Sequence, residues 1–392
     1  MKNAFLHTLG RVIRRELHII RKRPVYGLGS VGAMVLSMVF FLTFFRSGVP
    51  ENLPIGVVDL DQSSTSRLFR QQLDATQLGR AIPFLTVAEA RREMETGRIN
   101  AFIVIPDHFN EDVQAFRRPK MGIYVNTMEP VVGGALAYKD LLTMVNLTNG
   151  AVQREVLRMK GVSEREIMGR IQPIVVDAHM IGNAPTNYGY YLNNMILPGI
   201  LAMCVMLIVA YALGSELKYG TSKQLLETAD GSIVTAVVGK LIPYTVLFCT
   251  MGIVLVLFLY GWMHYPIRGS VGWMILAVVL LVFASEAVAT LIVSLVPTLR
   301  LSVCISALYS VLAFSFAGFT LPVSSLPAGL QGLSCIFPLR FYYQIFVREV
   351  LYGTGFAGWW GFLTILLAFL LLPFPAAKRL KDAYQYQNYP RN

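Results

Sequence analysis

The sequence predicts a helical membrane protein: a bundle of six transmembrane helices, with an α/β domain inserted outside the membrane between spans 1 and 2. Hydrophobic residues make up 55% of the 392 residues and charged residues only 15%, whereas soluble domains carry about 25% charged residues. The apolar residues gather in runs that approach or exceed the roughly 20 residues needed to cross about 30 Å of hydrocarbon. Residues 46–187 interrupt these runs, and their 16 basic residues balance 16 acidic ones.

The N-terminal residues 1–23 form a predicted amphipathic helix. Apolar side chains such as Leu9 and Ile13 share one arc of a helical wheel, and basic side chains occupy the opposite arc. Such a helix suits the cytoplasmic headgroup layer. The n-region of a signal peptide is the alternative, but the apolar run 24–45 is long enough to span and ends in Phe-Phe-Arg rather than a small-residue cleavage site. We therefore expect an uncleaved first span at 24–45.

Five further spans are expected within residues 188–376. Seven of the first 24 residues are Lys or Arg, which places the N-terminus in the cytoplasm. With six crossings the tail 377–392 is also cytoplasmic, and residues 46–187 are extracytoplasmic. The expected spans after the first are 190–213, 233–262, 271–296, 302–321 and 356–376.

The outer segment 46–187 alternates short strand-like runs with helix-like stretches, which predicts a compact α/β domain. The expected strands are Ile55–Val58, Ala101–Ile105 and Gly122–Val125, and the expected helices are Ser63–Leu73, Val87–Thr96 and Val131–Met159.

The charge distribution excludes a nucleic-acid-binding protein. Residues outside 46–187 hold 18 basic and 7 acidic residues and so account for the whole net charge of +11. A basic excess beside apolar spans is a topology signal and an attraction to anionic membrane lipids.

Motifs of enzymes and metal sites are absent from the sequence. Gly239-Lys240 is followed by Leu241 and lacks the earlier glycine of a P-loop, and there is no H-E-x-x-H or G-x-S-x-G. The four cysteines show neither metal-ligand nor disulfide-framework spacing. We therefore expect no catalytic residue, no metal site and no enzymatic activity in this chain.

A polar stretch between two long spans is the most informative segment. Residues 214–230 are predicted to form a short cytoplasmic helix with the pattern E-x-K-x-G-T-x-x-Q-L-L. Leucines at 217, 225 and 226 offer packing surface, and the charged residues suit a partner protein. An ordinary basic loop between two spans is the simpler interpretation.

This segment resembles the coupling helix of the permease subunits of ABC transporters of the type-2 exporter class, which reads approximately E-x-x-x-G-T-x-x-Q-L-L-x-T. The chain departs from the family at Ala229-Asp230, where a proline commonly follows the threonine. The resemblance implies that the segment docks on an ATPase through Glu216, Lys218, Tyr219, Gly220, Thr221, Gln224, Leu225 and Leu226.

Further motifs extend the resemblance over most of the chain. They include the P-G of Pro198-Gly199, the G-K-x-x-P-Y of Gly239 to Tyr244, and the P-x-R-G-S of Pro266 to Ser270. Prolines within 322–355 resemble a re-entrant outer segment before the last span. Arg15, Glu16 and Arg23 look like part of the family's amphipathic connecting helix.

The resemblance implies one transmembrane half of an exporter in a bacterial inner membrane. Two such chains pair, as a homodimer or a paralogous heterodimer, and each docks on a cytosolic ABC ATPase. ATP and Mg are bound by that partner, so this chain carries no cofactor of its own. The outer domain suggests, by analogy, contact with a periplasmic adaptor protein. Lipid, drug and polypeptide cargo remain open.

The competing interpretation is a membrane-anchored sensor or adaptor with an extracytoplasmic ligand-binding domain. A sensor needs a cytoplasmic output domain, whereas the expected cytoplasmic parts are short helices, loops and the tail 377–392. A secondary transporter normally shows internal repeats of similar halves, and the sequence shows none.

Two ionisable residues lie in apolar surroundings. Glu16 falls within the apolar arc of the N-terminal helix, where it either meets a neighbouring arginine at headgroup level or forms a salt bridge to Lys218 or Lys223. Glu286 lies in the middle of an expected span. Intramembrane carboxylates usually face the bundle interior or a water-filled cavity, which leaves a place on the substrate path, structural pairing with a neighbouring helix, or a misplaced span.

Overall fold

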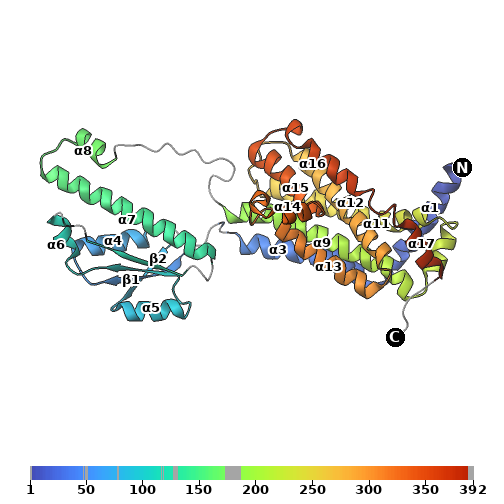
Figure 1. Ribbon diagram of the computed structural model, residues 1–392, viewed down its shortest axis with the longest axis horizontal. Helices are drawn as coiled ribbons and strands as arrows, with labels where there is room; N and C mark the ends of the chain where they lie inside the picture. Colours follow the sequence, from blue (N-terminus) through green and yellow to red (C-terminus); the bar gives the residue numbers. More distant parts are fainter. Residues whose placement is uncertain are drawn as a thin grey trace. The chain divides into compact units, whose positions relative to one another are not determined.

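The computed structural model describes residues 2–46, 48, 52–76, 79–115, 117, 119–126, 131–172 and 187–386. The chain divides into two compact units, both of which can be followed by colour in Figure 1. The first unit, which we call the bundle, comprises residues 1–46 and 180–392. The second, which we call the inserted unit, comprises residues 47–179.

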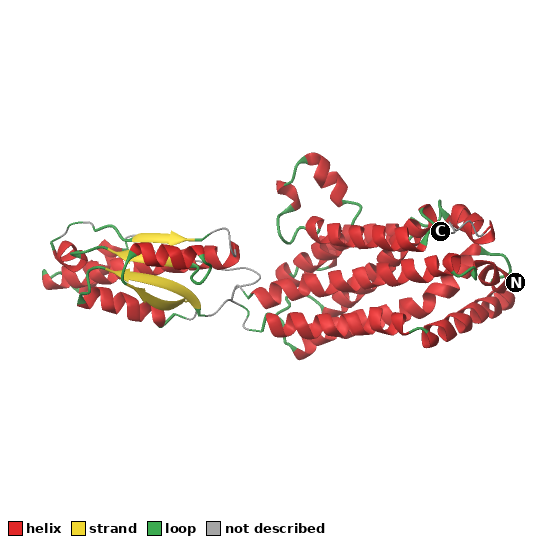
Figure 2. Cartoon of the chain, turned by 90° about the horizontal axis from the view of Figure 1, so that it is seen from below, coloured by secondary structure: helices red, strands yellow, loops and turns green. Residues whose placement is uncertain are grey.

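The centre of the inserted unit is a four-stranded sheet of order β2-β1-β3-β4, drawn in yellow in Figure 2. The central strand β1 pairs in parallel with β2 and β3, and β3 pairs antiparallel with β4. The strands are β1 (Leu53–Asp59), β2 (Gly79–Phe84), β3 (Ala101–Ile105) and β4 (Gly122–Val125).

Helices cover both faces of this sheet and enclose two separate hydrophobic clusters. Side chains of α4 and α7 pack on one face with Ile55 and Ile103, and Ala90 of α5 packs on the other with Phe102. Ser63 and Thr86 cap α4 and α5 by accepting a backbone N–H three residues later, as such caps do. The helices are α4 (Ser64–Asp74), α5 (Val87–Glu95), α6 (Phe109–Gln114), α7 (Val131–Met159) and α8 (Glu164–Ile171).

Strand β2 is an element that the sequence pattern did not predict. It contains Pro83, and a proline lacks the N–H that a central strand needs. In the structure β2 is an edge strand beside β1, where one side of the strand makes no ladder hydrogen bonds. A proline is tolerated at this position for that reason.

Five helical segments in the described part of the bundle are long and apolar enough to cross a membrane. A segment of α2 (Pro24–Gly27), η1 (Leu28–Gly32) and α3 (Ala33–Phe44) comes first. The others are α9 (Tyr188–Lys218), α11 (Ile233–Leu257) continued by η2 (Phe258–Trp262), α12 (Val271–Leu295) and α13 (Leu299–Phe316).

The sixth expected span, 356–376, contains a shorter helix. Here α16 (Phe356–Phe369) has 14 residues and so covers about 21 Å at 1.5 Å per residue. Turns follow around Pro373 and Pro375 before α17 (Ala377–Tyr386) begins. Between α13 and α16 lie η3 (Val323–Ser325), α14 (Ala328–Ser334), α15 (Pro338–Phe346) and η4 (Val347–Tyr352).

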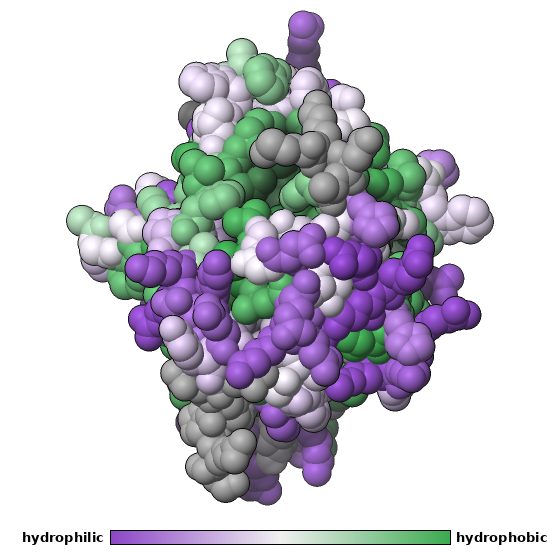
Figure 3. Space-filling view, turned by 90° about the vertical axis from the view of Figure 1, so that its right-hand side faces the viewer, coloured by the Kyte–Doolittle hydropathy of each residue, from purple (hydrophilic) through white to green (hydrophobic). Residues whose placement is uncertain are grey.

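Three short or amphipathic helices lie together at one end of the bundle. They are α1 (Lys2–Lys22), α10 (Ser222–Thr228) and α17, and α10 contacts both of the others. Figure 3 views the molecule from the end at which α1 begins, and hydrophilic side chains gather on that face.

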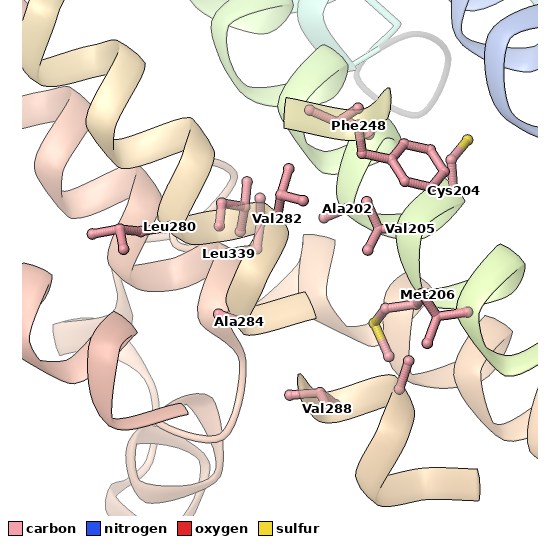
Figure 4. Close-up of a cluster of buried hydrophobic side chains, with 14 of the residues drawn as sticks. Ala202, Cys204, Val205, Met206, Phe248, Leu280, Val282, Ala284, Val288 and Leu339 are labelled. Carbon is pink, nitrogen blue, oxygen red and sulfur yellow. The ribbon is translucent and has the colours of Figure 1, made fainter. Parts of the chain in front are cut away.

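The bundle core is a single cluster of apolar side chains, part of which Figure 4 shows. It is centred on α9, which packs against α3, α12 and α13. Most of the apolar stretch of α9 is buried, so this helix lies at the centre of the bundle. The labelled side chains come from α9, α11, α12 and α15: Ala202, Cys204, Val205, Met206, Phe248, Leu280, Val282, Ala284, Val288 and Leu339.

Candidate functional site

The polar segment expected at 214–230 is two helices rather than one. Helix α9 continues to Lys218, a turn follows, and α10 covers only Ser222–Thr228. Glu216 and Lys218 therefore belong to the end of a long spanning helix, which corrects the predicted boundary. The helix continues because Ser215, Glu216 and Leu217 are buried against the bundle, although their polarity marks the end of the apolar run.

The turn between α9 and α10 depends on Gly220. Its φ is +69°, in the left-handed region that costs other residues about 1–2 kcal/mol.

We expect Gly220→Ala to lower the free energy of unfolding by about that amount, measured by thermal unfolding in detergent. Gly10→Ala is the control, because Gly10 is helical and a Cβ there meets no atom within 4 Å. An unchanged melting temperature for Gly220→Ala would contradict this account of the turn.

Glu216 is the acceptor at the centre of a buried ionic cluster. Arg15 donates to both of its carboxylate oxygens, at 2.8 and 2.9 Å. The Lys240 ammonium donates at 2.8 Å, and the Thr221 hydroxyl at 2.5 Å. One carboxylate thus joins α1, the end of α9, the first residue before α10, and α11.

Glu16 is the second acceptor of the cluster. Its carboxylate accepts from Lys240 at 2.5 Å and from the Tyr244 hydroxyl at 2.6 Å. Of the two alternatives for Glu16, the salt bridge to Lys218 or Lys223 is wrong, whereas a neighbouring arginine, Arg15, lies 4.0 Å from its carboxylate. Those two lysines are exposed, whereas Lys240 lies inside α11, four residues before Tyr244 and therefore on the same helix face.

Burial makes this cluster energetically important. Glu16 and Lys240 have 0% exposed side chains and Glu216 has 2%. Two carboxylates meet two cations, Arg15 and Lys240, so the buried charges balance. Although burial opposes the charged form of Arg15, its hydrogen bonds with Glu216 and the charges of Glu216 and Glu16 raise the pKa of Arg15 above its ordinary value.

Gly239 allows α1 to come close enough for these contacts. A Cβ built on Gly239 would lie 2.9 Å from the Cβ of Val12 and 3.3 Å from a methyl carbon of Leu9. Any larger side chain would push α1 away from α11. The glycine before Lys240 therefore has a packing role rather than a phosphate-binding one.

Further polar contacts fix the ends of α10. Asp230 accepts from Thr8 at 2.5 Å and from Arg11 at 2.8 Å, and these hydrogen bonds hold the pKa of Asp230 below its ordinary value. Asp230 is where the sequence departs from the resembled pattern. On the other side, the Ser222 hydroxyl donates to the backbone oxygen of Tyr384. The Tyr384 hydroxyl in turn donates to the backbone oxygen of Leu213.

The exposed surface of α10 is narrower than the sequence suggested. Leu225 and Leu226 are 0% and 7% exposed, so they anchor the helix on the bundle and offer no surface to another chain. Lys223, Gln224 and Glu227 are exposed.

A basic cavity of about 630 Å³ lies between α1 and the α9–α10 turn. Arg14, His18 and Gln224 line it. The guanidinium of Arg23 lies 4.4 Å from the ring centroid of Tyr219, so the cavity wall joins the predicted connecting-helix residues to those of the turn.

Glu286 lies apart from the ionic cluster. Its residue exposure is 5%, and its carboxylate accepts a hydrogen bond from Thr245 at 2.8 and 3.0 Å to the two oxygens. It therefore faces a protein neighbour rather than lipid alone. In the described part of the chain, no three His, Cys, Asp or Glu side chains gather as metal ligands would.

Sequence reasoning missed Lys240, Tyr244 and Asp230 as members of the site. The first two stood in a noted motif, G-K-x-x-P-Y, but the motif carried no role. Their signal was a lysine and a tyrosine one helical turn apart within an apolar run. Such a lysine is costly unless it has a partner.

Comparison with known proteins finds similarity to membrane transporters in each case. Residues 28–377 match the profile described as ABC-2 family transporter protein. The chain is similar to the inner membrane transport permease YhhJ of Escherichia coli (strain K12), with 25% identity over 326 residues, 80% of this chain and 81% of the relative. It is also similar to the ABC transporter G family member 20 of Dictyostelium discoideum, with 22% identity over 395 residues, 97% of this chain and 51% of the relative.

Proposed function

This chain belongs to the ABC-2 transporter family, and we propose that it is the transmembrane half of an exporter driven by a separate cytosolic ATPase. The family and the apolar helices make it a multi-pass membrane protein and a transmembrane transport subunit. Transport runs outward from the cytoplasm or inner membrane, both termini are cytoplasmic, and α10 docks on the ATPase. A second permease chain, either identical or paralogous, pairs with this one.

The observation that supports the docking surface is the way α10 is held. The ionic cluster and the Asp230 and Tyr384 contacts tie α10 to α1, α9, α11 and α17. A helix fixed on so many sides moves with the bundle as a rigid body. A push on its exposed face therefore reaches the spanning helices, which is what alternating access driven from outside the membrane requires.

In this proposal ATP and Mg are bound by the partner ATPase, and this chain contributes no nucleotide contact. Lys223, Gln224 and Glu227 meet the ATPase. Arg15, Glu16 and Glu216 act as positioning residues that hold α10. The basic termini lie in the cytoplasm, and the inserted unit lies in the periplasm of a bacterial inner membrane protein, where it is available to an adaptor protein.

The test is co-purification of the ATPase with the permease. Reversing both charges of the exposed face, Lys223→Glu with Glu227→Lys, is expected to lower the amount of bound ATPase at least tenfold. The melting temperature should stay unchanged, because exposed substitutions rarely cost more than about 0.5 kcal/mol. The matched control is the double reversal Arg165→Glu with Glu166→Lys on the exposed surface of α8. Equal ATPase recovery from both variants would refute docking through α10.

A further inference from the structure

A groove on the side of the bundle lies apart from the ionic cluster and from α10. It has a volume of about 470 Å³ and is formed by α11, α12 and the segment from the end of α16 into α17. Its walls are almost entirely apolar, with Val234, Val238, Val246, Phe283, Phe374 and Leu380 among them. The volume is within the range of small-molecule sites, roughly 300–1,000 Å³.

The groove is long rather than round. Its lining residues on α11 extend from Ile233 to Val246, which is about 20 Å at 1.5 Å per residue. Several of them, including Val238 at 43% and Val246 at 62%, are substantially exposed. The groove is therefore accessible to an elongated apolar molecule.

Glu286 is the one charged side chain among the described residues that line this groove. Its hydrogen-bond donor is Thr245, whose single hydroxyl hydrogen also faces the backbone oxygen of Leu241 at 3.1 Å. The other hydroxyls of the lining, Thr290 and Ser294, donate to backbone oxygens of their own helix. One shared hydrogen thus serves a carboxylate with about four acceptor positions.

The other buried carboxylates of the described chain are better compensated. Glu16 and Glu216 each contact a cation, and Glu349 accepts from the Trp359 indole and the Ser270 amide, both at 2.7 Å. A buried carboxylate without a cation carries a large desolvation cost. Glu286 is thus the carboxylate that a positive group entering from outside would stabilise most.

From these observations we propose that the groove binds a lipophilic cation, with its apolar body against α11 and its positive group at Glu286. Apolar walls bind the apolar part of a ligand whatever the sign of its charged group, and the carboxylate selects ligands whose charged group is positive. That such a cation is the transported cargo rests on the proposed function, whereas the binding itself does not.

The test measures binding to the purified full-length chain in detergent, without any ATPase. Equilibrium dialysis compares the decyltrimethylammonium cation with the decanesulfonate anion, which carries the same apolar chain and one charge at its end, against protein-free micelles. The wild-type chain is expected to bind the cation at least tenfold more tightly than the anion. Glu286→Gln should remove that preference, while Glu166→Gln, which removes an exposed carboxylate of α8 outside the groove, should retain it.

Each other result overturns the inference. Equal binding of both ions by the wild-type chain would mean a groove that selects only by shape, as for a lipid tail. An unchanged preference in Glu286→Gln would place the cation elsewhere, and no binding of either ion would leave the groove without this ligand class. Because the ATPase is absent, failure here is distinct from failure of the co-purification test.

Discussion

Replacement of Lys240 by methionine is expected to lower the free energy of unfolding of the bundle by about 3–5 kcal/mol, the usual cost of removing one partner from a buried ion pair. Lys240 donates to Glu16 and Glu216, and both carboxylates are buried. Without the ammonium, two negative charges share a dry site with Arg15 as the remaining cation. The melting temperature in detergent should fall by about 10 °C.

Two further variants separate charge from packing in this prediction. Lys218→Met removes an exposed lysine that follows Glu216 by two positions in the chain, and it should change the melting temperature little. The double variant Glu16→Gln with Lys240→Met restores charge balance, because Arg15 and Glu216 still pair and Tyr244 still has an oxygen to donate to. It should be more stable than Lys240→Met alone by roughly 0.5–3 kcal/mol. A double variant no more stable than the single one would show that the cost came from lost packing.

The location of the site was predictable from the sequence, but its contacts were not. The pattern around Gly220 indicated a short helix at 214–230, of which α10 is a part although the turn before it was not predicted, and Glu16 was recognised as a charge on an apolar arc. Its partner was sought among the lysines of the polar segment. The true partner, Lys240, is 224 positions away in the chain and lies inside an apolar run, where only the packing of α1 on α11 brings the two together.

Burial was the second property that the pattern could not give. Leu225 and Leu226 matched a docking motif, yet they face the bundle. The sequence shows that a leucine is apolar, but which side of a seven-residue helix is covered depends on its neighbours α1 and α17. The long spans were easier to predict, because run length alone identifies them.

The inserted unit shows the same division between local and long-range information. Strands β3 and β4 were predicted with the bounds that they have, since each is a short apolar run beside turn residues. Strand β2 was missed because Pro83 argues against a strand until its edge position is known.

The inserted unit is expected to unfold independently of the bundle, and Phe102→Ala is the variant that tests this. Phe102 is fully buried on β3 and stacks on Tyr124 with ring centroids 4.6 Å apart. Its removal should cost the unit about 3–5 kcal/mol, because the lost burial and the cavity left behind both count. The clusters of this unit share no residue with the bundle core, so the cost should fall on this unit alone.

Calorimetry and circular dichroism on residues 47–179 expressed alone are expected to show one cooperative transition, lowered by at least 10 °C in Phe102→Ala. Leu85→Ala is the control in the same unit, since Leu85 is 83% exposed and its loss should have little effect. In the full-length chain, the transition of the bundle and the recovery of bound ATPase should be the same for Phe102→Ala and wild type. A fragment without a transition, or a bundle that melts earlier when Phe102 is replaced, would mean that the two units stabilise each other and that the inserted unit is part of the mechanism rather than an attachment to it.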